Sequence, residues 1–287
     1  MARSVYVDGR YRRYAEAAIH AEDRGFQFGD AVYEVVEVRD GRLVDAPRHL
    51  DRLDRSLAAL SIAAPMSRAA LRHVLHETIR RNRVRDGTVY LQVSRGAAPR
   101  DFAYPAADVA PTVVCLARAS RPERIAATAA AGIAVRTMPD IRWGRCDIKT
   151  VMLLPACLAK AEARRHGARE AWLVDGDGLV TEGASSNAWI VTPAGEIVTR
   201  PRGPEILAGV TRQTVLDTAA ALGLAVVERP FTVAEALAAR ETFITSASNT
   251  VMPVVEIDGA AIGDGRPGPV ALRLREAFGR YADHASK

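Results

Sequence analysis

One lysine near the middle of the chain stands among apolar residues. Lys149 follows an isoleucine and precedes Thr-Val-Met-Leu-Leu, residues 150–154. Removing an ammonium group from water is costly, so a lysine held in apolar surroundings tends to lose its proton. A neutral amine can then attack a carbonyl carbon and form a Schiff base. The alternative is a side chain that runs along an apolar wall and keeps its charged head in water.

A second residue that could do chemistry is an acid in a stretch of small residues. Glu182 lies within Val-Thr-Glu-Gly-Ala-Ser-Ser-Asn, residues 180–187, which predicts a turn. If Lys149 binds the aldehyde of pyridoxal phosphate, that cofactor also needs an acid at its ring nitrogen and ligands for its phosphate. A carboxylate there favours the protonated ring, which can accept electrons from a carbanion. Considered alone, Glu182 is more often an exposed turn residue.

Two further segments and one arginine have groups that can bind a phosphate. Residues 209–211, Gly-Val-Thr, begin a predicted helix, where backbone N–H groups and a hydroxyl can face an anion. Residues 246–248, Ser-Ala-Ser, form a second loop of small side chains, and Arg52 can donate two charge-assisted hydrogen bonds at once. Each segment has an ordinary alternative, since Thr211 could cap its helix and Arg52 could be a surface charge.

Composition and charge narrow the class of protein. The 287 residues are 48% hydrophobic and 25% charged, which is typical of a folded protein with one large or two smaller domains. The net charge of +5 comes mostly from dispersed arginines, without the concentrated basic stripe of a nucleic-acid binder. No apolar run approaches the roughly 18 residues of a membrane span, and the first residues lack a signal-peptide core. We therefore expect a soluble cytoplasmic protein that binds neither nucleic acid nor membrane.

The cysteines and histidines argue against disulfide and metal chemistry. The three cysteines are an odd number without paired spacing, which suits a reducing cytosol. The six histidines are dispersed. His73 and His76 share a predicted helix, but no nearby cysteine or second histidine pair completes a zinc pattern. We therefore predict no metal site.

The first part of the chain predicts elements that would position Tyr33 and Arg52. Residues 31–38 are rich in β-branched side chains and end at an Asp-Gly turn, which predicts a strand. A helix begins at Pro47, with leucines at helical spacing and Arg52 outside that apolar face. Ser67 is placed to cap a second helix that runs to residue 82. Further strands are predicted at residues 88–94, at 112–117 and at 5–7, where the Asp-Gly pair at residues 8–9 then predicts a hairpin turn.

The second part of the chain also alternates strands with helices. Strands are predicted at residues 133–137, 171–174, 187–191, 196–199, 241–246 and 252–257, and helices at 151–166, 209–222 and 269–281, with a short helix capped by Thr232 and Glu235. Residues 120–124 are polar, contain a proline and predict a linker. We therefore predict an α+β protein with an N-terminal domain over residues 1–119, an interdomain linker over 120–132 and a C-terminal domain over 133–287 that carries Lys149.

Four motifs resemble those of the fold-type IV pyridoxal-phosphate aminotransferases. They are Phe-Gln-Phe-Gly-Asp-Ala-Val-Tyr-Glu at 26–34, Asp-Ile-Arg-Trp-Gly-Arg-Cys-Asp-Ile-Lys at 140–149, Val-Thr-Glu-Gly-Ala-Ser-Ser-Asn at 180–187 and Gly-Val-Thr-Arg at 209–212. Within that group they look most like the D-amino-acid transaminases, as against the branched-chain transaminases. The similarity runs in register from about Val5 to Ile257. It implies a two-domain α+β fold with the active site between the domains, and a homodimer.

The resemblance also implies a role for each candidate residue. Lys149 would be the Schiff-base lysine and the base that moves a proton between the substrate Cα and the cofactor C4′. Glu182 would partner the pyridine nitrogen and Arg52 the phosphate. The other cofactor-binding residues would be Asn187, Val210, Thr211, Ser246, Ala247 and Ser248. Tyr33 and Arg100 would belong to the substrate-carboxylate trap, with Arg100 contributed by the partner subunit.

One residue departs from the pattern of that family. The D-amino-acid enzymes carry Arg-x-His in the loop that here reads Arg100-Asp101-Phe102. Phenylalanine cannot donate a hydrogen bond to a carboxylate. A hydrogen bond to a charged group contributes roughly 1.5–3 kcal/mol, or about 10- to 150-fold in affinity. We therefore predict weaker capture of the substrate carboxylate, or a substrate held by a different arginine.

The resemblance implies a transaminase that moves the amino group of D-alanine or D-glutamate to a 2-oxo acid such as 2-oxoglutarate. Other reactions on the same scaffold stay open: a branched-chain L-amino-acid transaminase, an (R)-selective amine transaminase and an aminodeoxychorismate lyase. Phe102 leaves room for an amine without a carboxylate. A catalytically silent binding module, such as a basic nucleic-acid binder, is the alternative from another class, and the presence of both Lys149 and Glu182 argues against it.

Overall fold

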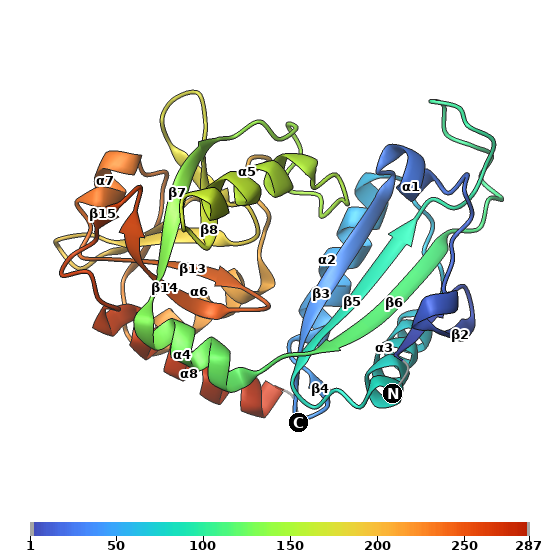
Figure 1. Ribbon diagram of the computed structural model, residues 1–287, viewed down its shortest axis with the longest axis horizontal. Coiled ribbons are helices and arrows are strands. Elements are labelled where there is room, and N and C mark those ends of the chain that lie inside the picture. The colour runs from blue at the N-terminus through green and yellow to red at the C-terminus, as the bar shows by residue number, and fades with distance from the viewer. Residues whose placement is uncertain (1–2, 286–287) are drawn as a thin grey trace. The chain divides into compact units, whose positions relative to one another are not determined.

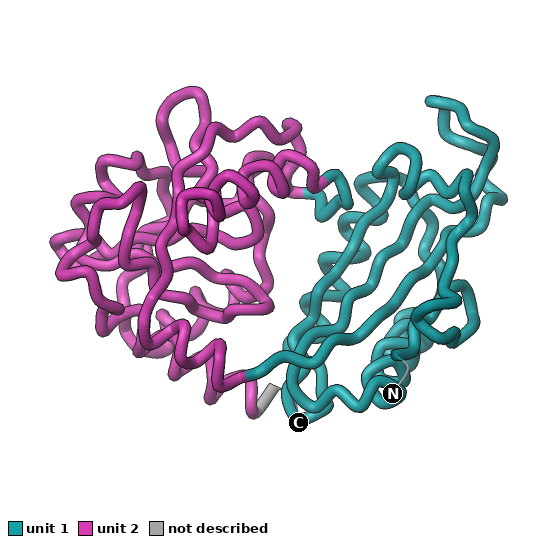
Figure 2. The backbone as a smooth tube through the Cα atoms, viewed as in Figure 1, with its two compact units in different colours: residues 1–121, 148–152, 285–287 teal, residues 122–147, 153–284 magenta. Residues whose placement is uncertain are grey.

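The chain folds into two compact units, shown in different colours in Figure 2. The computed structural model describes residues 3–285, with the side chains of residues 284 and 285 left out. Unit 1 comprises residues 3–121 and 148–152, and unit 2 comprises residues 122–147 and 153–284. Residues 1–2 and 286–287, which end the two predicted domains, lie outside the described residues. Both units combine helices with a mainly antiparallel sheet, which confirms the predicted α+β fold class.

Unit 1 is built on one six-stranded sheet in the order β2-β1-β6-β5-β3-β4, with every neighbouring pair antiparallel. The strands are β1 (Ser4–Val7), β2 (Arg10–Arg13), β3 (Ala31–Arg39), β4 (Arg42–Leu43), β5 (Gly87–Ser94) and β6 (Thr112–Ala119). The predicted Asp-Gly turns close two of the hairpins. Asp8 and Gly9 have φ of 43° and 83°, the left-handed conformation that a tight two-residue hairpin requires.

Two long helices cover one face of this sheet (Figure 1). Helix α2 (Ala46–Ala59) places Leu50, Leu53 and Leu57 in the core, against strand residues such as Val36 and Leu91. Helix α3 (Arg68–Asn82) is capped by the Ser67 hydroxyl, as predicted. A 3-10 helix (Tyr14–Glu16) and the short helix α1 (Arg24–Phe28) complete the unit.

Unit 2 contains a nine-stranded mixed sheet in the order β12-β11-β10-β13-β14-β7-β8-β9, with β15 paired to β14. The strands are β7 (Ile133–Pro139), β8 (Glu170–Val174), β9 (Val180–Gly183), β10 (Asn187–Val191), β11 (Ile197–Thr199), β12 (Val226–Glu228), β13 (Glu241–Ser246), β14 (Thr250–Ile257) and β15 (Ala260–Ala261). Sequence reasoning treated residues 180–187 as a turn and missed β9. The first residues of this motif are a buried strand, and the turn is confined to residues 184–186.

The helices of unit 2 are α4 (Pro122–Ala131), α5 (Leu154–Arg165), α6 (Val210–Ala221), α7 (Val233–Leu237) and α8 (Pro269–Ala285). The capping box of Thr232 and Glu235 at the start of α7 is present as predicted. Helix α5 begins at Leu154 rather than at residue 151. Within the described residues, no helix is both long and apolar enough to cross a membrane.

The unit boundaries differ from the predicted domain boundaries in two places. Most of the predicted linker forms α4, whose Ala129 packs into the core of unit 2. Residues 148–152, predicted for the C-terminal domain, belong to unit 1. Their backbone pairs with the start of β3, because Tyr33 N donates to Lys149 O at 3.0 Å and Val151 N donates to Ala31 O at 3.1 Å. This pairing also explains why α5 begins later than predicted.

Candidate active site

Lys149 is held through its backbone by two elements of unit 1. Its carbonyl oxygen accepts the hydrogen bond from Tyr33 N of β3, and its own N–H donates to Ser56 Oγ of α2 at 3.3 Å. The side chain then extends over Tyr33, with Nζ 4.2 Å from the centre of the ring. Both polar groups of the Lys149 backbone are therefore bonded, and its amine lies over an aromatic face.

The apolar neighbours of Lys149 in the sequence differ in their exposure. Met152 and Leu154 are 46% and 70% exposed, and Leu153 is exposed as well. Ile148, by contrast, is buried in the core of unit 1. Residues 149–151 pair with the start of β3 instead of continuing into a helix. The aromatic surface beside the lysine comes from Tyr33, which is far away in the sequence.

Two residues that sequence reasoning missed lie next to Tyr33 on the same sheet face. The rings of Tyr33 and Tyr90 are 5.6 Å apart, and the Tyr90 hydroxyl donates to Gln92 Oε1 at 2.7 Å. Burial raises the pKa of Tyr90 to about 12, so its hydroxyl keeps the proton that it donates. The alternation of side chains along β5 contained the signal, since Tyr90 and Gln92 share one face of that strand.

Arg52 is a buried residue rather than the surface charge considered as an alternative. Its Nε and Nη2 donate to the two carboxylate oxygens of Glu34, each at 2.8 Å. Glu34 and Arg52 are only 2% and 5% exposed. Arg52 lies outside the leucine face of α2, as expected, but it is buried as well, because α2 buries polar as well as apolar side chains.

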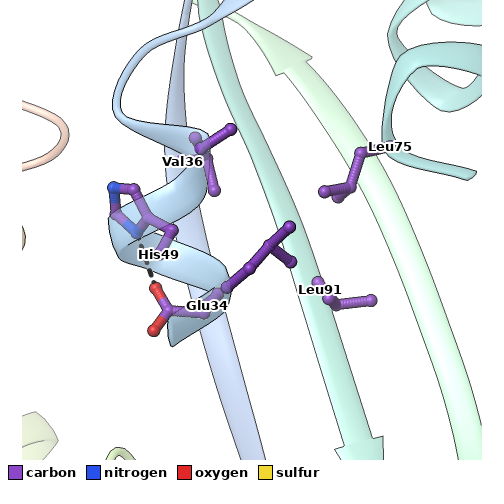
Figure 3. Close-up of a pocket in the computed structure, with 7 residues that line it drawn as sticks. Glu34, Val36, His49, Leu75 and Leu91 are labelled. Atoms are coloured by element: carbon purple, nitrogen blue, oxygen red, sulfur yellow. Dashed lines mark hydrogen bonds and ion pairs between the residues drawn. The ribbon is translucent and has the colours of Figure 1, made fainter. Parts of the chain in front are cut away.

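A buried histidine shares the carboxylate of Glu34 with Arg52. His49 Nδ1 lies 2.8 Å from Glu34 Oε2, beside a small cavity that is lined mostly by apolar side chains (Figure 3). Burial opposes the charge on Glu34, but the Arg52 charge and the hydrogen bonds from Arg52 and His49 outweigh it and lower the pKa of Glu34 to about 2. Burial lowers the pKa of His49. The orientation of the Arg52 guanidinium is thus fixed by an ionised partner.

Glu182 lies on β9 of unit 2 and is buried, which excludes the exposed-turn interpretation. Its carboxylate accepts hydrogen bonds from Arg142 Nη1 at 2.5 Å, from Asn187 Nδ2 at 2.9 Å and from Leu207 N at 3.1 Å. These three donors come from three separate segments of unit 2. They stabilise a carboxylate over a carboxylic acid, because hydrogen bonds to the charged form favour it.

Arg142 links Glu182 to a second acid, and sequence reasoning assigned it no role. Its guanidinium donates to both oxygens of Asp140, at 2.9 and 2.8 Å, and Thr181 Oγ1 donates to the same residue at 2.7 Å. Burial opposes the charge on Asp140, but the hydrogen bond and charge of Arg142 lower the pKa of that carboxyl. Arg142 lies within the motif at residues 140–149, and this position could have indicated a role for it at the site.

Asn187 connects Glu182 to the loop before α6. Its amide Nδ2 donates to Glu182 Oε2 and also to Leu207 O at 3.0 Å. A Cβ atom at Gly209 would lie 2.1 Å from Asn187 Oδ1, so only glycine fits there without a shift. These contacts hold the acid in place, and the expected role of Asn187 in cofactor binding stays a prediction.

The two predicted phosphate-binding segments both belong to unit 2. Helix α6 begins after Gly209, which has no side chain to cap it, and Val210 and Thr211 are buried in its first turn. Thr211 is therefore not the N-cap residue considered as an alternative. In the turn between β13 and β14, Ser246 Oγ and Ser248 Oγ lie 3.5 Å apart, and Asn249 Nδ2 donates to both at 3.3 Å. Helix α6 packs against β13, which carries Ser246.

The loop at residues 95–102 carries the remaining predicted residues. Within the described residues, Arg100 makes ring contacts with Phe28 and Phe102, at 5.1 and 5.7 Å from the ring centres. Phe102 also packs edge-on against Phe28 and is 81% exposed. The structure therefore brings Tyr33 to Lys149, and it groups Arg100 and Phe102 with each other.

The candidate residues of the two units carry groups that suit an organic cofactor. In the part of the chain that the structure describes, no cluster of three or more His, Cys, Asp or Glu side chains is arranged to hold a metal ion. The groups on hand are an amine, fixed carboxylates, arginines and hydroxyls. These are the groups that bind an aldehyde, a heterocyclic nitrogen and a phosphate.

The chain is similar to known aminotransferases. The sequence matches the family described as Amino-transferase class IV over residues 31–257. A D-alanine aminotransferase of Bacillus licheniformis is 41% identical over 274 residues, covering 96% of this chain and 95% of that protein. A D-alanine aminotransferase of Staphylococcus haemolyticus is 36% identical over 282 residues, covering 98% and 99%.

Solved structures match the fold over nearly its whole length. A hypothetical aminotransferase from Mycobacterium tuberculosis, in its PLP-bound form, has a TM-score of 0.84 and 25% identity, covering 97% of this chain and 98% of that one. The Escherichia coli branched-chain amino acid aminotransferase has a TM-score of 0.90 and 24% identity, covering 100% and 97%. The family match spans most of the chain and includes Lys149, Glu182 and the start of α6. The chain belongs to the class IV aminotransferases.

Proposed function

We propose that this aminotransferase uses pyridoxal phosphate to move the amino group of a D-amino acid, such as D-alanine or D-glutamate, to a 2-oxo acid such as 2-oxoglutarate. The observation that carries the proposal is the fixed amine of Lys149, whose backbone is bonded on both sides and whose Nζ lies over Tyr33. The similarity of the chain to D-alanine aminotransferases over nearly its full length supports a D-amino acid as the donor.

The residues of both units fit the needs of this coenzyme. Lys149 supplies the amine for its aldehyde, and Arg52 a guanidinium for its phosphate. Glu182 supplies a carboxylate for the pyridine nitrogen. Further phosphate ligands come from the uncapped start of α6 and from the Ser246–Ser248 turn, that is, Val210, Thr211, Ser246, Ala247 and Ser248. Pyridoxal phosphate, when bound, supplies an electron sink that stabilises negative charge at the substrate Cα.

The side chains of this protein then position the substrate and move its proton. With the coenzyme bound, Lys149 would be the base that takes the proton from the substrate Cα and moves it toward the coenzyme. Tyr33 keeps that amine in place through its ring. Glu182, fixed by Arg142, Asn187 and Leu207 N, remains an anion and favours a protonated pyridine ring.

We also propose that two copies of the chain form a homodimer in the cytoplasm. Support for association comes from large apolar side chains that are exposed in the single chain, among them Ile141, Leu154 and Phe102. In the dimer, Arg100 would contribute to the substrate-carboxylate trap of the partner subunit. Support for a reducing compartment comes from Cys115, Cys146 and Cys157, which are all free thiols.

A carboxylate-free amine is the second candidate for the donor. Phe102 exposes an apolar ring where the D-amino-acid enzymes carry a histidine, and this favours an amine such as (R)-1-phenylethylamine over a carboxylate. Among the described residues, no comparable feature favours the branched-chain or the aminodeoxychorismate reaction.

One experiment separates these donors. The purified protein, loaded with pyridoxal phosphate, is mixed in turn with D-alanine, L-leucine, (R)-1-phenylethylamine and aminodeoxychorismate, without an acceptor. We expect D-alanine to bleach the visible band of the lysine-bound coenzyme and to release pyruvate. If L-leucine bleached this band and D-alanine did not, the stereochemical assignment would be overturned. Borohydride reduction followed by peptide mapping should label Lys149, and a label elsewhere would refute its role.

A further inference from the structure

Helix α2 buries two parallel stripes of side chains. Leu50, Leu53 and Leu57 form the apolar stripe that packs in the core of unit 1. His49, Arg52 and Ser56 repeat the same spacing one position earlier, and they are buried as well. A buried polar stripe is destabilising unless each of its members finds a hydrogen-bond partner. The partners of this stripe therefore show what it is for.

The first two members of the polar stripe bind one carboxylate. Glu34 accepts hydrogen bonds from Arg52 Nε and Nη2 and lies 2.8 Å from His49 Nδ1. A guanidinium that donates two bonds to one carboxylate cannot rotate without breaking both. Arg52 is thereby fixed to β3 as well as to α2.

The third member reaches the lysine. Ser56 stands four positions after Arg52, one helical turn along α2, and its hydroxyl accepts the N–H of Lys149 at 3.3 Å. Glu34 follows Tyr33 in β3, and Tyr33 N–H binds the carbonyl of Lys149. Strand β3 therefore holds Lys149 through the backbone of Tyr33 and Arg52 through the side chain of Glu34.

We propose that Ser56 is a positioning residue that sets the spacing between the amine of Lys149 and the guanidinium of Arg52. This inference rests on the proposed function, in which those two groups bind the aldehyde and the phosphate of one coenzyme. The distance between aldehyde and phosphate is limited by the covalent structure of the coenzyme, so the protein must match it. The helical turn of α2 between Arg52 and Ser56 fixes this distance rigidly, because Glu34 anchors the helix to β3.

The test compares three probes of the apoprotein in a Ser56→Ala variant. Pyridoxal phosphate needs both groups, pyridoxal lacks the phosphate, and inorganic phosphate lacks the aldehyde. Titration of the visible band measures the first two dissociation constants, and calorimetry measures the third. We expect Ser56→Ala to weaken pyridoxal phosphate about 3- to 10-fold, the effect of one net hydrogen bond. Pyridoxal and inorganic phosphate should change less than about 2-fold, because neither is held at both ends.

A matched control removes a buried hydroxyl elsewhere in unit 1. Thr78 of α3 is buried, and its hydroxyl donates to Val74 O within its own helix at 2.7 Å. Thr78→Val should lower thermal stability to a similar degree while leaving the affinity for pyridoxal phosphate unchanged. This variant therefore shows what a general loss of stability does to coenzyme binding.

Several outcomes would overturn the inference. An unchanged affinity for pyridoxal phosphate in Ser56→Ala would show that the hydroxyl sets nothing. Equal losses for all three probes, matched by Thr78→Val, would show a purely structural role. A loss confined to inorganic phosphate would make Ser56 a direct anion ligand. A wild-type protein that binds no pyridoxal phosphate would refute the proposed function and this inference with it, whereas the other outcomes leave the proposed function standing.

Discussion

Substitution of Glu34 by glutamine tests how strongly the buried ion pair of unit 1 stabilises the fold. Glutamine keeps the shape of the side chain but removes the negative charge that faces Arg52 and His49. The folded chain would then bury the Arg52 guanidinium without this anion. We therefore expect Glu34→Gln to lower the free energy of unfolding at neutral pH.

The pKa of Glu34 gives the magnitude. It falls from 4.5 to about 2 in the folded protein, because the charge and hydrogen bonds of Arg52 outweigh the opposing effect of burial. At about 1.4 kcal/mol per pKa unit, this change corresponds to about 3 kcal/mol. Breaking a buried ion pair by removing one partner typically costs about 3–5 kcal/mol, so the two arguments agree.

The sign of the pH dependence follows from the direction of the shift. Because the pKa of Glu34 is lower in the folded state, its stabilisation is fully present above pH 4.5 and is lost as the pH falls toward 2. Urea unfolding from neutral to acid pH should therefore show a difference of about 3 kcal/mol between wild type and Glu34→Gln at neutral pH. That difference should shrink toward zero at the acid end.

A surface carboxylate provides the control. The pKa of Glu77 is also lowered to about 2, chiefly by its hydrogen bond from Arg80, but this pair lies at the surface of α3. Salt screens exposed pairs far more than buried ones. Added salt should therefore abolish the effect of Glu77→Gln and leave that of Glu34→Gln. A loss below about 1 kcal/mol for Glu34→Gln, or a loss that does not vary with pH, would refute the reasoning.

Three further predictions concern the site and its surroundings. Glu182→Gln should lower kcat about 10- to 1,000-fold in coenzyme-saturated protein, because an opposite charge at the ring nitrogen shifts the pKa of that nitrogen by about one to three units. Glu182→Asp keeps the charge and should retain more activity. Equal activity in both variants would contradict the assigned role. Phe102→His should raise kcat/KM for D-alanine about 10- to 150-fold, and no change would place Phe102 outside the carboxylate trap. Burial lowers the pKa of His49, so the unfolded chain takes up a proton first and stability should fall as the pH drops below 6.5. His49→Gln should reduce this dependence of the melting temperature on pH. An unchanged dependence would show that another group causes it.

Local elements of the fold could be predicted from the sequence. The Asp8-Gly9 hairpin, the Ser67 cap and the capping box of Thr232 and Glu235 are all present. Turns and caps depend on residues within about four positions, so the sequence contains all the information that determines them. The same holds for the leucine stripe of α2.

Elements that depend on distant partners could not be predicted in this way. Residues 148–152 follow an apolar pattern that favours an earlier start for α5, but they pair with β3 instead. The strand β9 contains a glycine and precedes a serine-rich turn, and its pairing with β8 stabilises it. Arg52 is buried because Glu34 lies opposite it across the layer between α2 and β3. In each case a contact formed across the fold outweighs the local preference.

The candidate site shows the same division. The sequence by itself determined which side chains are candidates for the chemistry, because an amine and a carboxylate can be recognised by residue type and by the motifs around them. Only the tertiary structure decided their surroundings: Tyr33 and Ser56 for Lys149, and Arg142 and Asn187 for Glu182. Reactivity depends on burial and on charged neighbours within a few ångströms, and folding brings these neighbours together from segments that lie far apart in the chain.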